Sequence, residues 1–220
     1  MIHVALGADA ALVMAVVREP HLPHVAPRGI PSAQYPIGVR IYTRTGDDGT
    51  TGLLYGGRIS KSDPAAKAYG AVDETVAVLG LARALTDRPV LQAILLEVQR
   101  GLFVVGADLA TNPDQRAKLK PEISLVTAAM VARLETMIDE AVEQHPLPEE
   151  FVVPGANPVS ATLDVARATC RRAERGAVRL AEAEREVNPE AAKYLNRLSD
   201  LLFVLARWQA GGPEEPSRPR

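Results

Sequence analysis

The sequence predicts an all-α protein built as a five-helix up-and-down bundle, and three observations support this. Aromatic residues make up only 4% of the 220 residues, while alanine, leucine and valine dominate, which favours helices over a sandwich or barrel. Asp63-Pro64, Asn157-Pro158 and Asn188-Pro189 each join an N-cap residue to a proline at the first helical position. Helical segments of about 20 to 30 residues joined by short loops are typical of such bundles.

The limits of each expected helix come from caps at the start and from proline or glycine at the end. Ser124 is the candidate cap of the third helix, Asn112-Pro113 closes the second, and Gly211-Gly212 ends the fifth. The expected ranges are 63–86, 89–109, 124–144, 157–186 and 188–211. Residues 39–62, which precede them, are rich in glycine and threonine and are expected to form a loop region.

Apolar residues line one face of each of the last two helices, as the core side of a bundle helix requires. In the fourth helix they are Val159, Leu163, Ala166, Cys170, Ala173, Ala177 and Leu180. In the fifth they are Leu195, Leu198, Leu201, Leu202, Leu205 and Trp208. We interpret Cys170, the single cysteine, as a core residue. The lack of any disulfide framework fits the reducing cytoplasm, where we expect the protein.

The bundle domain is expected to span residues 39–211, with a flexible extension at 1–38 and a flexible tail at 212–220. Five prolines between residues 20 and 36 would break any long helix in the extension. A net charge of −2 provides no overall field that would recruit nucleic acid or an anionic membrane. Zinc-ligand spacings are absent, so no metal site built by the protein alone is expected.

A stripe of arginines on the fourth helix is the most informative pattern in the chain. Arg167, Arg171 and Arg175 are four residues apart and therefore share one helical face. Like charges at this spacing repel by roughly 0.2–0.5 kcal/mol per pair, so the stripe indicates an anion opposite it. Arginine suits carboxylate or phosphate because it stays charged and presents a planar fork. A solvated face, with Glu174 and Asp164 as intrahelical partners, is an open alternative.

Residues 43–52 have the threonine and glycine density of a backbone cradle for phosphate. The Walker pattern is absent, and a surface turn is the alternative interpretation. Lys61, just before the first helix, has the position of a lysine that helps backbone amides to hold an anion, or of one that is simply solvated.

Two polar residues inside expected helices also need partners. Flanking small and apolar residues predict that Asp73 is partly buried, and an arginine of the stripe is its natural partner. Asn196 shares a face with Asp200. Asparagine is unfavourable in a helix interior, so Asn196 has either a specific hydrogen-bonding role or a polar contact in the core.

Three of these segments, in order, resemble the cobalamin adenosyltransferases of the propanediol-utilisation (PduO) type. They are residues 41–49, 166–175 and 194–201, within a resemblance that spans about residues 39–208. The resemblance implies a ferritin-like five-helix bundle that forms a homotrimer with active sites between subunits. It implies transfer of the 5′-deoxyadenosyl group of ATP to cob(I)alamin, with release of triphosphate. A corrinoid reductase and an adenosylcobalamin-dependent acceptor enzyme are the implied partners.

The resemblance also implies roles for individual residues. Those that would surround the nucleotide phosphates are Thr43, Arg44, Thr45, Gly46, Thr51, Gly52 and Lys61. Those that would hold and orient the triphosphate are Arg171, Arg172, Glu174 and Arg175, with magnesium bridging phosphate oxygens. Asn196 would contact the nucleotide, and Asp73 would pair with Arg167 across the subunit interface.

Phe151 matches the aromatic residue that, by the same resemblance, helps to exclude the lower ligand of the corrin. The four-coordinate cobalt(II) that results is easier to reduce. Phe203 is a second candidate, and packing against the start of the fourth helix is the alternative for Phe151. Ala156 stands where the family commonly has a second glycine after Pro154.

Cob(I)alamin is itself a strong nucleophile, so the protein needs no general base. The expected tasks of the protein are to align cobalt with C5′ and to neutralise the departing polyphosphate. Two other classes of function stay open. One is a catalytically silent cobalamin carrier, against which the glycine- and threonine-rich loop argues. The other is an interaction protein whose arginine stripe only builds a trimer.

Overall fold

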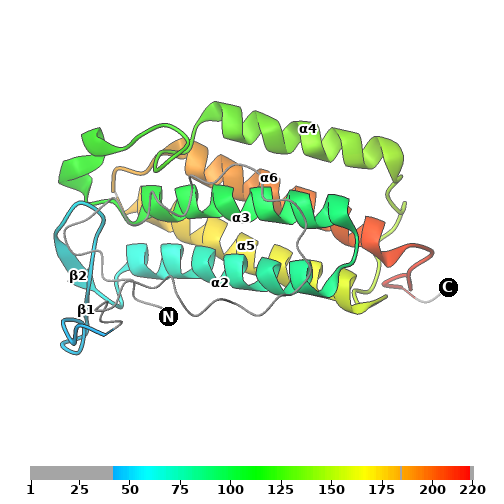
Figure 1. Ribbon diagram of the computed structural model, residues 1–220, viewed down its shortest axis with the longest axis horizontal. Helices are drawn as coiled ribbons and strands as arrows, with labels where there is room; N and C mark the ends of the chain where they lie inside the picture. Colours follow the sequence, from blue (N-terminus) through cyan, green and yellow to red (C-terminus); the bar gives the residue numbers. More distant parts are fainter. Residues whose placement is uncertain (1–41, 184, 219–220) are drawn as a thin grey trace, which may run out of the picture.

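A computed structural model describes residues 42–183 and 185–218, and the expected extension at 1–38 lies outside these residues. Five long helices form an up-and-down bundle in this part of the chain, in which successive helices run in opposite directions (Figure 1). They are α2 Pro64–Leu85, α3 Pro89–Leu109, α4 Ala128–Gln144, α5 Pro158–Glu182 and α6 Pro189–Ala210. The predicted fold class is confirmed.

The cap-and-proline starts of three helices are confirmed by their hydrogen bonds. The Asp63 side chain accepts from the Ala65 amide at 2.8 Å, at the start of α2. Asn157 and Ser160 form a reciprocal capping box at the start of α5. Asn188 accepts from the Glu190 amide at 3.1 Å, at the start of α6. These bonds satisfy amides that have no partner within the helix.

Two expected helix limits are wrong. Thr127, not Ser124, caps α4, because the Ser124 hydroxyl accepts from the Lys120 amide at 3.0 Å in the preceding turn. The fourth predicted helix ends at Glu182 rather than near residue 186, since the next residues must turn the chain into α6. A 3-10 helix, η1 Pro113–Lys118, follows α3 and was not expected.

The region expected to be a loop contains a short antiparallel hairpin. Its strands are β1 Thr50–Gly52 and β2 Arg58–Ser60, with Thr51 opposite Ile59. Leu54, between the strands, donates to the Ala110 carbonyl at 2.9 Å and accepts from the Asn112 amide at 3.1 Å. These bonds hold the hairpin at the end of the bundle where α2 begins and α3 ends (Figure 1).

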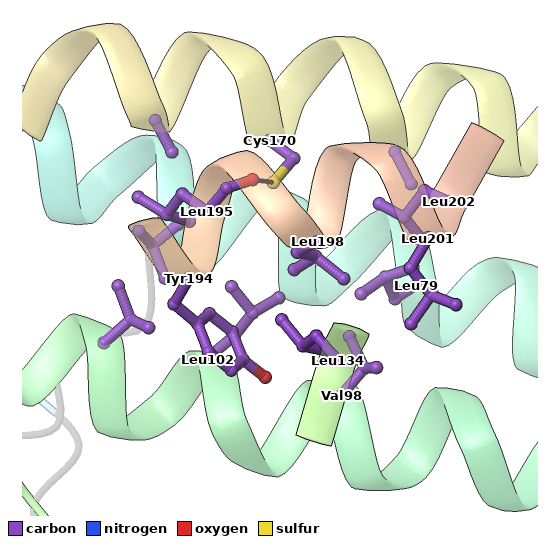
Figure 2. Close-up of a cluster of buried hydrophobic side chains, with 14 of the residues drawn as sticks. Leu79, Val98, Leu102, Leu134, Cys170, Tyr194, Leu195, Leu198, Leu201 and Leu202 are labelled. Carbon is purple, nitrogen blue, oxygen red and sulfur yellow. Dashed lines mark hydrogen bonds between the residues drawn. The ribbon is translucent and has the colours of Figure 1, made fainter. Parts of the chain in front are cut away.

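The core lies where α5 packs against α2 on one side and α6 on the other, with α3 beside α2 and α4 beside α6. Figure 2 shows the leucines of α6 meeting Cys170 of α5 and side chains of α3. Cys170 is fully buried and its thiol donates to the Leu195 carbonyl at 3.2 Å, which confirms its assignment to the core. Burial strongly raises the pKa of this thiol.

Helix α3 is the one helix of the described residues that could cross a membrane by length and composition alone. A core helix of a bundle meets the same criterion, and Leu91, Leu95 and Leu102 of α3 are fully buried in this core. The packing of the bundle accounts for only part of the apolar character of α3, because Val90 and Phe103 of the same helix are exposed.

The end of the chain differs from the expected flexible tail. Residues 213–218 run beside the loop that precedes α5, with Val152 paired antiparallel to Pro216. The Val153 amide donates to the Glu215 carbonyl, and the Ser217 amide donates to the Phe151 carbonyl, each at 2.7 Å. The tail is thus fixed at the end of the bundle opposite the hairpin.

Candidate functional site

Arg171 and Arg175 lie on the exposed face of α5. Within the part of the chain that the structure describes, neither makes a hydrogen bond or an ion pair. Their neighbours are paired: Arg172 forms an ion pair with Glu74 of α2, and Glu174 accepts from Asn196 of α6 at 3.0 Å. The two unpaired guanidinium groups therefore occupy a face of α5 that is flanked by α2 and α6.

Arg167, the third member of the stripe, has an intrahelical partner. Its Nε lies 3.3 Å from Oδ1 of Asp164, one turn earlier. The solvated-face alternative is thus correct for Arg167. Arg171 and Arg175 are also exposed, but among the described residues neither pairs with Glu174, which is held by Asn196 instead.

Asn196 has the specific hydrogen bonds that its place in a helix predicted. Its amide donates to Glu174, and its Oδ1 accepts from Nη1 of Arg197 at 2.6 Å. Arg197 also donates to Glu135 of α4 at 2.8 Å. This chain of contacts links α5, α6 and α4 and fixes the orientation of Glu174 beside the unpaired arginines.

Asp73 is exposed, so the expectation that it is partly buried is wrong for the single chain. On α2 the residues that turn inward are Ala71, Val72 and Thr75, and Asp73 points away from them. Small and apolar neighbours in the sequence say little about burial, because successive helical residues are rotated by about 100°. Asp73 has no ion pair among the described residues and is available to another molecule.

The loop of residues 43–52, which we call the phosphate loop after its predicted role, is closed by two cations. Nζ of Lys61 donates to the Gly46 carbonyl at 2.6 Å, and the Lys61 amide donates to the Gly49 carbonyl at 2.9 Å. A Cβ at Gly46 would lie 3.2 Å from that Nζ, so glycine permits this close approach. Arg58 of β2 donates to the carbonyl of Thr45 and to the hydroxyl of Thr50.

Asp48 orders the far side of the phosphate loop. Its Oδ1 accepts from the hydroxyl of Thr50 at 2.7 Å and from the Thr50 amide at 2.9 Å. These two hydrogen bonds lower the pKa of the Asp48 carboxyl. Asp48 therefore stays ionised and holds the turn that leads into β1.

The other predicted residues of the loop are exposed, with one exception. Thr43, Arg44, Thr45 and Gly52 are accessible or partly so, and Arg44 has a positive φ of 62°. Thr51 is buried at 8% exposure, because β1 turns it towards the bundle. A direct contact between the Thr51 side chain and a phosphate does not fit this placement.

Phe151 and Phe203 lie towards the other end of the bundle. Phe151 is 84% exposed, so the alternative in which it packs against the start of α5 is wrong. Phe203 of α6 is half-buried, with the guanidinium of Arg207 5.2 Å above its ring. The loop before α5, which carries Phe151, lies at the end of the bundle opposite the hairpin (Figure 1), so one chain does not bring Phe151 and the phosphate loop together.

The phosphate loop and the arginine stripe are also separate within one chain. Among the described residues, no hydrogen bond or ion pair joins the loop or Lys61 to Arg171, Arg172 or Arg175. The predicted site residues thus fall into three groups on one chain: the loop, the middle of α5, and the Phe151 end.

Sequence reasoning missed the roles of Arg58, Arg197 and Arg207, which orient the predicted residues. Arg197 lies within the recognised segment 194–201, whereas Arg58 and Arg207 lie outside the three recognised segments. Arg58 follows two glycines with positive φ in the hairpin turn, a pattern that would have suggested a hairpin rather than a loop. The role of Arg207 depends on a carboxylate of the tail and carries no local signal.

Comparisons with known proteins assign this architecture. The family model described as cobalamin adenosyltransferase matches residues 41–209. A corrinoid adenosyltransferase of Citrobacter freundii is 42% identical over 175 residues, which cover 80% of this chain and 97% of the relative. A corrinoid adenosyltransferase of Mycobacterium leprae is 44% identical over 187 residues, covering 79% and 97% respectively.

Solved structures of a PduO-type ATP:corrinoid adenosyltransferase from Lactobacillus reuteri have the same fold. A phenylalanine-to-alanine variant complexed with cobalamin and ATP superposes with a TM-score of 0.75 at 33% identity, covering 82% of this chain and all of that one. An arginine-to-lysine variant complexed with ATP gives a TM-score of 0.72 at 34% identity, covering 80% and 99%.

Proposed function

Since this chain belongs to the cobalamin adenosyltransferase family and transfers the adenosyl group of ATP to cobalamin, we propose that the transfer takes place where two copies of the chain meet. The observation that carries this proposal is the separation of the site residues within one chain. Among the described residues, Arg171 and Arg175 have no anionic partner, and no hydrogen bond or ion pair joins them to the phosphate loop. A neighbouring copy that presented its loop to this face of α5 would complete the site.

Arg171 and Arg175 are the residues we assign to the triphosphate. Two unpaired guanidinium groups one turn apart repel each other, and a bound polyphosphate would remove that repulsion. The negative charge on the leaving group grows as its bond to C5′ breaks, so these groups stabilise the transition state more than the ground state. Arg172 and Glu174 keep their own partners and orient the face.

We assign the phosphate loop and Lys61 of one copy to the phosphates of the ATP whose triphosphate is held by Arg171 and Arg175 of the neighbouring copy. The ammonium of Lys61 already contacts the Gly46 carbonyl, so it is held at the edge of the loop before any nucleotide binds. No cluster of three or more His, Cys, Asp or Glu side chains among the described residues could hold a metal ion. Magnesium that accompanies ATP would therefore take its ligands mainly from phosphate oxygens and water.

The reaction needs alignment rather than proton transfer. The electron pair of cobalt(I) attacks C5′, a cobalt–carbon bond forms, and the C5′–oxygen bond breaks with its electrons leaving on triphosphate. No proton moves in this step, so the protein needs no general base. Its residues align the reacting atoms and neutralise the leaving group.

The remaining parts of the proposal concern assembly and partners. The exposed Asp73 would pair with Arg167 of a neighbouring copy, in a homotrimer with shared sites. Phe151 and Phe203 would form the apolar side of the corrinoid site. A reductase would supply the reduced corrinoid, and an adenosylcobalamin-dependent enzyme would accept the product, both in the cytoplasm.

An Arg171→Ala variant tests the assignment of the triphosphate site. Purified protein is mixed anaerobically with cob(I)alamin and Mg-ATP, and the loss of the cob(I)alamin absorbance and the release of triphosphate are followed. We expect kcat/KM to fall by roughly 100- to 1,000-fold while corrinoid binding persists. Arg100→Ala, which removes an exposed arginine of α3 that has no partner among the described residues, is the matched control and should turn over normally. Unchanged turnover of Arg171→Ala would contradict the assignment.

A further inference from the structure

The tail of the chain, which we define as residues 212–218, holds the loop that carries Phe151. Its backbone makes two hydrogen bonds of 2.7 Å to this loop, one on either side of the Val152–Pro216 pair. The carbonyl of Phe151 is one of the acceptors, although its side chain is 84% exposed. The position of the Phe151 backbone therefore depends on the position of the tail.

A buried ion cluster anchors the tail to the bundle. Nε of Arg207 lies 3.0 Å from Oε2 of Glu214, and the Nη2 of Arg207 donates to Oδ2 of Asp164 at 2.5 Å. The side chains of Arg207 and Glu214 are each 5% exposed, and that of Asp164 is 6% exposed. Asp164 also pairs with Arg167, so two carboxylates and two arginines balance in charge.

The cost of burying Glu214 argues that its position matters. A buried carboxylate loses its hydration, and burial raises the pKa of Glu214 despite the nearby arginine. Its Oε1 has no hydrogen-bond partner among the described residues. A terminal segment without a role would be expected to leave this glutamate in water.

Arg207 contacts both of the elements that carry the predicted corrinoid residues. Its guanidinium lies 5.2 Å from the centre of the Phe203 ring, and its ion pair with Glu214 holds the tail that supports Phe151. Through Asp164 it also reaches Arg167, which belongs to the arginine stripe. One side chain thus joins Phe203, the Phe151 loop and α5.

We propose that Arg207 is a positioning residue for the corrinoid side of the site, which acts by anchoring the tail through Glu214 so that the tail holds Phe151 in place. The proposal rests on the assignment of Phe151 and Phe203 to the corrinoid. It assigns a role to the end of the chain, which carries no recognised motif.

The test compares three changes to the protein, two substitutions and one truncation. Glu214→Gln keeps the shape of the side chain and removes its charge, and a stop codon after Gly212 removes the strand that supports Phe151. Glu215→Gln is the matched control, since Glu215 is the exposed neighbour and uses only its backbone carbonyl in the contact. The measured quantities are KM for cob(I)alamin, KM for ATP, kcat, and the visible and paramagnetic-resonance spectra of bound cob(II)alamin with ATP.

We expect Glu214→Gln and the truncation to raise KM for cob(I)alamin by about fivefold or more, with KM for ATP within about twofold. The spectra should show a smaller fraction of cobalt(II) without its lower ligand, and Glu215→Gln should match the wild type. The proposal would be overturned if Glu214→Gln and the truncated protein both had the corrinoid KM and the spectra of the wild type. It would also be overturned if KM for ATP rose as much as KM for cob(I)alamin, because an equal rise is the sign of general destabilisation.

Failure of this proposal is distinguishable from failure of the proposed site. If the wild type turns over and Arg171→Ala does not, the assignment of the triphosphate site stands whatever Glu214→Gln does. A more conservative change, Arg207→Lys, keeps the charge but loses the fork that serves two carboxylates at once. The KM of Arg207→Lys for cob(I)alamin should lie between those of the wild type and the truncated protein. A KM equal to that of the wild type would contradict the positioning role of Arg207.

Discussion

Mixed oligomers test whether the phosphate loop of one copy works with the arginines of another. Lys61→Ala removes the ammonium group that contacts the Gly46 carbonyl at 2.6 Å, and Arg171→Ala removes an unpaired guanidinium from the middle of α5. No hydrogen bond or ion pair joins these two groups within the described part of one chain. Each variant alone is expected to lose roughly 100-fold in kcat/KM, because each removes a charge that faces the phosphates.

The activity of a mixture follows from counting intact sites. In an equal mixture, the loop of a site comes from an Arg171→Ala copy, whose Lys61 is intact, with a chance of about one half. The arginines of that site come from a Lys61→Ala copy, whose Arg171 is intact, with the same chance. About a quarter of the sites in an unselected mixture then contain both wild-type groups, and in mixed trimers, which purification through both tags selects, the fraction is about one third. We therefore expect about a third of the wild-type rate from the purified mixed trimers, well above that of either variant alone.

The assay is the anaerobic conversion of cob(I)alamin by oligomers formed by co-expression of two differently tagged variants and purified through both tags in turn. The matched control joins Arg171→Ala to a copy that carries both substitutions, because this mixture contains no site with wild-type arginines. Mixed oligomers with no more activity than their parents would refute the shared site. They would show that the loop and α5 of a single chain act together.

Three further predictions concern single elements of the fold. Gly176→Val should lower the free energy of unfolding, measured by urea titration, by about 1–3 kcal/mol, because a Cβ at this position would already lie 3.0 Å from a backbone atom of α2. Gly212→Ala, where a Cβ would meet no atom within 4 Å, should leave the free energy of unfolding unchanged. Cys170 should resist iodoacetamide at pH 9 in the folded protein and react at once in guanidinium chloride; fast reaction in the folded state would argue against its burial and raised pKa. Asp48 has a lowered pKa, so its stabilising effect on the phosphate loop should be present above the ordinary carboxyl pKa and be lost as the pH falls through the lowered value. In Thr50→Val the pKa of Asp48, followed by NMR, should move up towards normal, and an unchanged value would contradict the role of the hydroxyl.

The comparison of expected and observed helices shows where local sequence is sufficient. The starts of α2, α5 and α6 agree with prediction, because an aspartate or asparagine followed by proline satisfies the first amides within a few residues. The start of α4 was misplaced because Ser124 and Thr127 are both good caps. The choice between them depends on the turn at Lys120, which no helix pattern encodes.

The candidate site shows the same division. Helical periodicity places Arg171 and Arg175 on one face, and the ordered motifs identify the family. Periodicity does not say that Arg172 and Glu174 are paired while Arg171 and Arg175 are free. That depends on Glu74 of α2 and on Asn196 of α6, which lie far away in the sequence.

The sequence alone determined the class of fold, the caps of three helices, the apolar faces of α5 and α6, and the residues that identify the family, because all of these depend on spacing along the chain. Only the tertiary structure decided that Asp73 is exposed, that Thr51 is buried, and that Glu214 is anchored by Arg207. The physical reason is that burial and ion pairing depend on which elements meet in space. Two side chains more than 40 positions apart, such as Arg207 and Asp164, carry no signal in the sequence that they form a pair.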